Sequence, residues 1–183
     1  MRNKVQLVFI LIILLVQAGC GCMYIVRHDE PYHGKVVDQE TREPIEGAVV
    51  LGTWHKQHNS LGGGYSSYYD SRETITDKNG EFTIPGQGVL VLSNVNYIAV
   101  LIYKSGYTYF ESQWASLKID DVLREKVKWD GEMPIFPLRK LTDEERKKRR
   151  DTWDTIPSVG NSPSVLMMQE INKEHIFRGL PTF

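Results

Sequence analysis

Short hydrophobic runs separated by polar connections dominate the first two thirds of the chain. Residues 36–37 and 48–51 are apolar and rich in valine, and residues 81–84 alternate between polar and apolar side chains. Runs and alternations of this length predict β-strands. Further strands are predicted at residues 96–103, 108–113 and 133–138.

The predicted strand around residues 97–103 differs from the others, because residues 98–102 are all apolar. A strand with one face in water would alternate between apolar and polar side chains. This strand is therefore predicted to be central, with both faces covered. The core between two sheets would cover one face, and the C-terminal part of the chain would cover the other.

Residues 139–183 change character and predict a helical extension. Thr142 and Glu145 form a capping box, and acidic residues precede basic ones as the helix dipole favours. A second helix is predicted to begin at residues 162–163 and to end near Gly179. Its methionine-containing apolar side chains either pack on the sheets or dock a partner.

Two polar connections have the composition of turns. Pro44, which lacks a backbone N–H, fits the end of the connection at residues 38–44. Asp77 and Gly80 suit the first and last positions of a type I turn. Each connection is predicted to join two neighbouring strands as a β-hairpin.

The same segments carry a family resemblance. Four segments resemble, in the same order, the motifs of the carboxypeptidase regulatory-like domain; they are residues 34–38, 44–50, 76–84 and 103–107. The resemblance covers roughly residues 33–110. It implies a prealbumin-like antiparallel β-sandwich, usually an accessory module and not a catalyst. The predicted fold is thus a mainly β sandwich over residues 33–138, followed by the helical extension at 139–183.

The N-terminus has the layout of a secretory signal. A basic start precedes an apolar stretch at residues 5–16, and small residues follow it. Residues 18–20 resemble a bacterial lipobox, which implies that Cys20 is acylated and becomes the mature N-terminus. Residues 1–19 are then a lipoprotein-type signal peptide, and residues 20–32 a tether.

Two alternatives to this lipid anchor stay open. Residues 5–26 carry no charge and could form an uncleaved membrane anchor, or the chain could simply be secreted. Gly21 follows the lipobox cysteine, which by resemblance implies the outer membrane, facing the periplasm. The only other cysteine is Cys22, so no disulfide is predicted in the folded part.

The charge balance argues against nucleic acid as a partner. The formal charge of the whole chain is −1, and removal of Arg2 and Lys4 with residues 1–19 changes it to −3. A near-neutral chain has no global attraction for a polyanion. The basic run at residues 146–150 follows acidic residues and is interpreted as part of a solvated helix.

No catalytic motif is recognisable in the chain. The histidines lack the His-x-x-Glu spacing of zinc carboxypeptidases, and the C-terminus lacks the Tyr-Arg-Gly-Ser-like tail of the hydroxyisourate hydrolases that share the prealbumin-like fold. His55, His58 and Asp70 form an incomplete metal-ligand set, on which a metalloenzyme is an alternative hypothesis. We therefore expect no catalytic residues, no metal and no cofactor, and we expect that the protein is not an enzyme.

The connection at residues 54–72 is longer than in the family and rich in aromatic side chains. Four of them are candidates for ligand binding: Trp54, Tyr65, Tyr68 and Tyr69. Flat aromatic groups among small polar residues can stack on sugars or bind a protein strand. The alternative is a long β-hairpin whose tyrosines pack on one another.

The sequence predicts a membrane-anchored, non-enzymatic cell-envelope lipoprotein that acts as a binding or structural module. Its expected partners are the membrane, reached through the lipid, and an envelope protein or glycan. The alternative function is a carbohydrate-binding module that uses the aromatic insert at residues 54–69.

Overall fold

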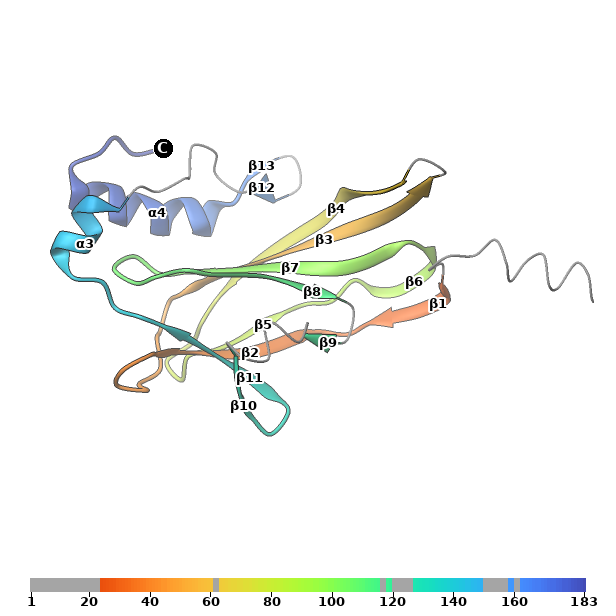
Figure 1. Cartoon of the computed structure of the whole chain (residues 1–183), viewed down its shortest axis with the longest axis horizontal. Helices are drawn as coiled ribbons and strands as arrows, with labels where there is room; N and C mark the ends of the chain where they lie inside the picture. Colours follow the sequence, from red (N-terminus) through yellow and green to blue (C-terminus); the bar gives the residue numbers. More distant parts are fainter. Residues whose placement is uncertain (1–23, 61–62, 116–117, 120–126, 150–157, 160–161) are drawn as a thin grey trace, which may run out of the picture.

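The computed structural model describes residues 24–60, 63–115, 118–119, 127–149, 158–159 and 162–183. In this part of the chain, strands form two layers and two helices lie beside one of them (Figure 1). The predicted fold, a mainly β antiparallel sandwich with a helical C-terminal extension, is confirmed.

The larger sheet is antiparallel, with the strand order β4-β3-β7-β8-β9. Its strands are β3 (Val49–Ser60), β4 (Gly63–Ile75), β7 (Val95–Tyr103), β8 (Phe110–Ala115) and β9 (Lys118–Ile119). β3 and β4 form a long hairpin that pairs from Val49 opposite Ile75 to Ser60 opposite Gly63. The strands predicted at residues 96–103 and 108–113 are β7 and β8.

The facing sheet has the strand order β10-β11-β2-β5. Its strands are β2 (Tyr32–Asp38), β5 (Glu81–Ile84), β10 (Lys128–Asp130) and β11 (Met133–Leu138). β11 runs parallel to β2, and the other pairs are antiparallel. Two further pairs complete the described strands: β1 (Tyr24–Asp29) with β6 (Gly88–Ser93), and β12 (Ser158–Val159) with β13 (Ser162–Pro163).

β1 lies within the segment where the sequence predicts a tether. Its pairing with β6 places residues 24–29 in the folded part of the chain. Asp29 explains this, because its buried carboxylate accepts hydrogen bonds from Trp54 Nε1 and from the backbone N–H of Gln87, both at 2.9 Å. These partners are far away in sequence, so the local pattern of residues 20–32 does not reveal them.

The two predicted hairpins are instead crossings between the sheets. β2 and β3 lie in different sheets, and so do β4 and β5. Asp38 closes the connection after β2, because its carboxylate accepts from the backbone N–H groups of Glu40 and Thr41 at 2.8 and 3.0 Å. Asp77 closes the connection after β4 in the same way. The turn residues were identified correctly, but the pairing of the strands around them was not.

The two crossings are hydrogen-bonded to each other. The N–H of Val36 donates to the carbonyl of Gly80 at 2.8 Å. The hydroxyl of Thr76 donates to the carbonyl of Ile45 at 2.6 Å and accepts from the N–H of Ala48 at 2.8 Å. Gly80 has a φ of +74°, and a Cβ on it would lie 2.4 Å from the carbonyl oxygen of Val36. The two crossings, which contain three of the four segments that carry the family resemblance, therefore act together as one join between the layers.

The core fills the space between the sheets. Its fully buried side chains include Val36, Val50, Trp54, Ile84, Ile98, Val100, Ile102, Phe136 and Leu138. Gly34 lets two rings approach the backbone, because a Cβ there would lie 2.7 Å from both Phe82 and Phe136.

Helix α4 (Val165–Arg178) covers the outer face of the larger sheet. Met167 and Ile171 pack there on a second buried cluster, formed by Val49, Leu51, Leu101 and Tyr103. β7 is thus covered on both faces, which confirms the prediction from its unbroken apolar run. Of the two alternatives for the second helix, packing on the sandwich is the one found. The helix begins at Val165 and ends before Gly179, whose φ is +70°.

The N-terminus of α4 is capped by a side chain from the sheet. The backbone N–H groups of Leu166 and Met167 donate to the carboxylate of Glu73 at 3.1 and 3.4 Å. The hydroxyl of Ser164 donates to the same carboxylate. A carboxylate in this position satisfies N–H groups that the helix leaves unpaired and complements the helix dipole. β4 therefore fixes where α4 begins.

An ion pair joins α4 to helix α3 (Asp143–Lys148). Arg146 Nη2 donates to the fully buried carboxylate of Glu174 at 2.8 Å. Glu174 also accepts from the hydroxyl of Ser105 at 2.8 Å and from the N–H of Gly106 at 3.0 Å. Burial alone would raise the pKa of Glu174, but the bonds from Arg146 and Ser105 hold this pKa below its ordinary value. Both helices are thereby tied to the turn after β7.

Neither of the helices in the described ranges has the length and apolarity that crossing a membrane requires.

Candidate functional site

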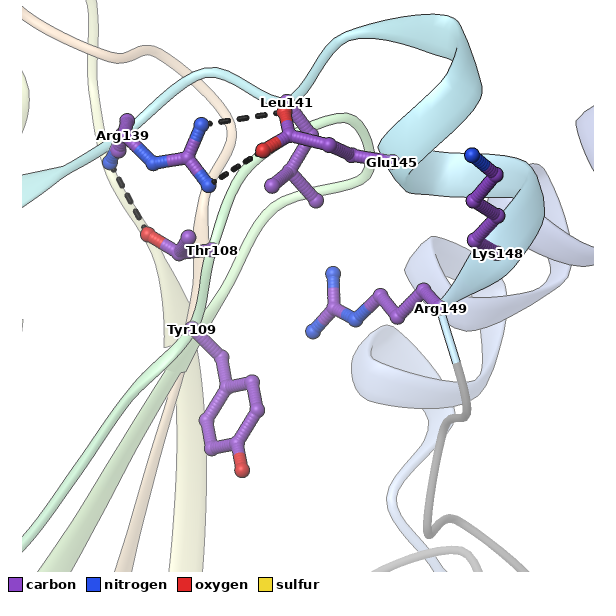
Figure 2. A pocket seen from close by; sticks show the side chains of 7 residues that line it. All are labelled: Thr108, Tyr109, Arg139, Leu141, Glu145, Lys148 and Arg149. Carbon is purple, nitrogen blue, oxygen red and sulfur yellow. Dashed lines mark hydrogen bonds and ion pairs between the residues drawn. The ribbon is translucent and has the colours of Figure 1, made fainter.

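An open pocket of about 400 Å³ lies beside α3, where the turn after β7 meets the segment that follows β11 (Figure 2). Seven residues line it: Thr108, Tyr109, Arg139, Leu141, Glu145, Lys148 and Arg149. They come from three parts of the chain that the fold brings together.

Backbone hydrogen bonds hold the wall of this pocket in place. The N–H of Thr108 donates to the carbonyl of Arg139 at 2.8 Å, and the N–H of Arg139 donates to the hydroxyl of Thr108 at 3.0 Å. The N–H of Leu141 donates to the carbonyl of Gly106 at 2.8 Å. The two segments thus pair like strands, and the pocket has a fixed frame.

Arg139 and Glu145 form a bidentate pair on one side of the pocket, with N···O distances of 3.0 and 3.1 Å (Figure 2). Glu145 also completes the predicted capping box with Thr142, which is confirmed. The hydrogen bond from Arg139 and the backbone N–H of Thr142 lower the pKa of Glu145 to about 2. Arg139 is therefore neutralised within the protein.

Lys148 and Arg149 give the other side of the pocket a positive charge. Arg149 donates to the carbonyl of Tyr107 at 2.9 Å, and its guanidinium carbon lies 5.4 Å from the centre of the Tyr109 ring. Lys148 is exposed. Two cations at the edge of the pocket, one of them beside an aromatic ring, suit a carboxylate or another anionic group on a flat or aromatic partner. The chemical capacity of the pocket is thus binding of an anion.

Some of the residues that line this pocket belong to motifs that the sequence shows, but the sequence does not show that they come together in a pocket. The capping box and the basic run were recognised, yet the run was interpreted as part of a solvated helix. Thr108 and Tyr109 carry no motif, and only the pairing between residues 106–108 and 139–141 brings them to α3.

Trp54 lies at the centre of the core and not on the surface. It is fully buried, donates to Asp29, and meets the ring of Tyr32 edge-on at 6.1 Å. A buried indole with a satisfied N–H cannot contact a ligand from solvent. Trp54 is therefore not part of a ligand-binding surface on this hairpin.

The three candidate tyrosines lie on two faces of the β3/β4 hairpin. Tyr65 stacks on His58 with ring centres 4.7 Å apart, and Tyr69 packs against the core, so both lie on the inner side. Tyr68 is opposite His55, on the outer side. Tyr65 and Tyr68 are exposed, whereas Tyr69 is half-buried. The four aromatic residues do not form one platform, and ligand binding by the two exposed tyrosines stays a prediction.

The candidate metal ligands are also separated. His55 stacks on Tyr97 at 4.8 Å, on the face opposite to His58. Burial lowers the pKa of His55. Asp70 accepts from Gln87 Nε2 at 2.8 Å instead of facing either histidine. Within the described ranges, no group of three or more His, Cys, Asp or Glu side chains is placed to hold a metal ion.

Cys20 and the signal segment at residues 1–19 lie outside the described residues. The lipid anchor and the uncleaved anchor therefore both stay predictions.

No protein-family model matches the chain, and no curated protein matches it. A 3-chlorocatechol 1,2-dioxygenase from Rhodococcus opacus is similar in structure at 18% identity and a TM-score of 0.36, over 62% of this chain and 60% of that chain. A catechol 1,2-dioxygenase from Acinetobacter radioresistens is 18% identical with a TM-score of 0.34, over 75% and 58%. A pilus adhesin from Streptococcus pneumoniae is 13% identical with a TM-score of 0.35, over 62% and 15%.

This chain spans 60% or less of the length of these three proteins. At such identities the likeness is limited to a β-sandwich fold. Membership of the carboxypeptidase regulatory-like family is not confirmed.

The expectation that the protein is not an enzyme is contradicted by the comparison with solved structures. Catechol and hydroxyquinol 1,2-dioxygenases are among the similar structures. Only fold-level similarity is present, and no dioxygenase activity follows for this chain.

Proposed function

We propose that this protein is a membrane-anchored cell-envelope module, in which a β-sandwich of the carboxypeptidase regulatory-like type holds a binding surface. The anchor is a lipid on Cys20, in the outer membrane. The observation that carries the proposal is the short distance in sequence between the lipobox-like segment and the fold. Cys20 stands four positions before Tyr24, where β1 begins.

The position of the pocket beside α3, far from the proposed anchor, supports a binding role for it. β1 and α3 lie at opposite ends of the long axis of the molecule (Figure 1). A protein anchored next to β1 would therefore carry the pocket away from the membrane. With Lys148 and Arg149 at its edge, the pocket suits an envelope partner that offers an anionic group.

Cell fractionation tests the anchor. The Cys20→Ala variant is expected to leave the membrane fraction, or to persist there only as the unprocessed precursor. Cys22→Ala is the matched control, because it removes a cysteine two residues away and leaves the lipobox-like residues intact. Processed Cys20→Ala protein that fractionates with membranes as the wild type does would refute the lipid anchor.

Crosslinking in intact cells tests the pocket. A photo-crosslinking amino acid in place of Tyr109 is expected to capture an envelope component, and Lys148→Glu is expected to reduce that capture. Lys147→Glu is the matched control, because Lys147 is also exposed on α3 but does not line the pocket. Equal capture with both charge reversals would rule out this surface.

A glycan site on the β3/β4 hairpin is the second candidate function. The hairpin extends beyond its last pair with β7, Lys56 opposite Val95, and Tyr65 on this extension is 60% exposed. An exposed ring next to polar side chains can stack on a sugar. Glycan binding that survives joint replacement of Tyr65 and Tyr68 by alanine would exclude these residues.

A further inference from the structure

The ribbon of β1 and β6 exposes an apolar face. Val26, Val89 and Val91 are 62%, 65% and 61% exposed, and the neighbouring Leu92 is 60% exposed. Val26 is the cross-strand partner of Val91. Side chains opposite each other on an antiparallel pair share a face. Val26, Val89 and Val91 therefore form one surface, the valine face. His28, the partner of Val89, completes it, and none of these residues carries a permanent charge.

The opposite face of the ribbon is turned toward the core. Leu90 is buried in the core cluster, and Asp29 is buried with its bonds to Trp54 and Gln87. β6 thus carries apolar side chains on both faces, whereas a solvated strand would carry polar side chains on its outer face. Contiguous exposed apolar surface on a soluble domain marks a site of interaction with a protein or a membrane.

The position of this ribbon in the chain indicates what covers it. Four residue steps separate Cys20 from Tyr24, the first residue of β1. An extended chain spans at most about 3.5 Å per residue, so β1 begins within about 14 Å of the anchoring residue. A chain fixed to a bilayer at Cys20 has no room to hold this end of the sandwich far from the lipid surface.

We infer that the valine face of the β1/β6 ribbon lies against the lipid bilayer, with its side chains at the boundary between headgroups and acyl chains. The inference rests on the proposed membrane anchor and specifies how the sandwich is oriented above it. Apolar side chains at this boundary enter it by about 5–10 Å. The lipid anchor and the valine face then act as two linked attachments, and the second is effectively intramolecular.

This orientation has a structural consequence at the neighbouring hairpin. Asn94, directly after β6, accepts from the N–H of Gln57 at 2.9 Å and donates from its side chain to the carbonyl of Gln57 at 3.0 Å. The end of the ribbon is thereby fixed to β3. A bilayer that holds the ribbon would hold the β3/β4 hairpin with it, whereas α3 lies at the other end of the long axis (Figure 1).

Fluorescence quenching in vesicles tests the inference. The full processed chain is reconstituted into vesicles of phosphatidylethanolamine and phosphatidylglycerol, part of which carry brominated acyl chains. An environment-sensitive fluorescent amino acid is placed at position 91 or, as the distant control, at position 176, where Ile176 of α4 is 69% exposed. Position 91 is expected to lose much of its fluorescence to the brominated lipid, and position 176 to lose little.

Aspartate substitutions on the valine face distinguish contact of this face with the lipid from mere proximity to it. The pair Val26→Asp and Val89→Asp is expected to abolish the quenching at position 91 while the chain stays bound to the vesicles. Val165→Asp, at a position that is 52% exposed on α4, is expected to leave the quenching unchanged.

Three results would overturn the inference. Quenching at position 91 that is no greater than at position 176, in a chain that floats with the vesicles, refutes the docked face but leaves the anchor intact. Shielding of position 91 from iodide without quenching by lipid would assign the face to a second copy of the chain or another protein. A processed chain that does not float with the vesicles refutes the anchor, and the docked face with it.

Discussion

Replacement of Glu174 by alanine is expected to release α4 from the sandwich. The Glu174 carboxylate is fully buried, and four donor atoms point at it: Nε and Nη2 of Arg146, the hydroxyl of Ser105 and the N–H of Gly106. Alanine removes the carboxylate whose negative charge balances Arg146. The guanidinium of Arg146, with 16% of its side chain exposed, would then be left without the carboxylate in a mostly buried site.

The expected loss of stability follows from the burial of this ion pair. Removal of one partner of a buried ion pair typically costs 3–5 kcal/mol, and the partial exposure of Arg146 places this variant near the lower end, at about 3 kcal/mol. For a chain of this size, 1 kcal/mol corresponds to about 2–4 °C in melting temperature, so a loss of about 6–12 °C is expected. Glu174→Gln keeps the shape and part of the hydrogen bonding, and it should lose less.

Thermal unfolding followed by circular dichroism measures this loss, with Glu144→Ala as the control. Glu144 is an exposed acidic residue of α3, so its removal changes the net charge equally without touching the buried pair. Amide hydrogen exchange should show the largest loss of protection in α4 and in the turn at residues 103–106, which the pair joins. A melting temperature of Glu174→Ala within 2–3 °C of the control, about 1 kcal/mol, would refute the reasoning.

Three further predictions concern the joins between elements. Glu73→Ala should remove the cap of α4 and lower the free energy of unfolding by about 1–2 kcal/mol in denaturant titrations, and a loss below about 0.5 kcal/mol would show that the cap is dispensable. Gly80→Ala should cost about 2 kcal/mol or more, because its Cβ would meet the carbonyl of Val36 at 2.4 Å. Gly131→Ala, where φ is +61° and no atom lies within 4 Å of the new Cβ, should cost clearly less, and equal costs would refute the steric argument. The pKa of Glu174 is lower in the folded chain than its ordinary 4.5, so the stability that it adds is present above pH 4.5 and is lost as the pH falls below it. Melting temperatures of wild type and Glu174→Gln should therefore converge in acid, and a constant difference between them would contradict the assignment.

Patterns that depend on near neighbours were recognised from the sequence. The apolar row at residues 98–102 predicts a strand covered on both faces, and β7 has the core on one face and α4 on the other. The capping box of α3 and the glycine after α4 are also found. In each case the residues that determine the outcome lie within a few positions of each other.

Interactions between distant residues were not recognised. The sequence placed Trp54 in a surface site, because its polar neighbours resemble a binding loop. Its register in β3 instead turns it inward, where it meets Asp29 of β1. A one-residue change in register would place the same side chain on the outer face, so composition alone cannot assign it.

Local chemistry in the sequence determined the strands, the turn-closing aspartates and the ends of the helices. The tertiary structure decided which strands pair across each turn, which carboxylates are buried, and which surfaces remain. Glu73 and Glu174 carry no motif, yet one caps α4 and the other anchors it, because folding brings β4 and the turn after β7 to that helix. The same holds for the pocket beside α3 and for the valine face of β1 and β6. Each is formed by segments that only the pairing of the sheets brings together, and the energy of such contacts depends on face and register, which no local pattern records.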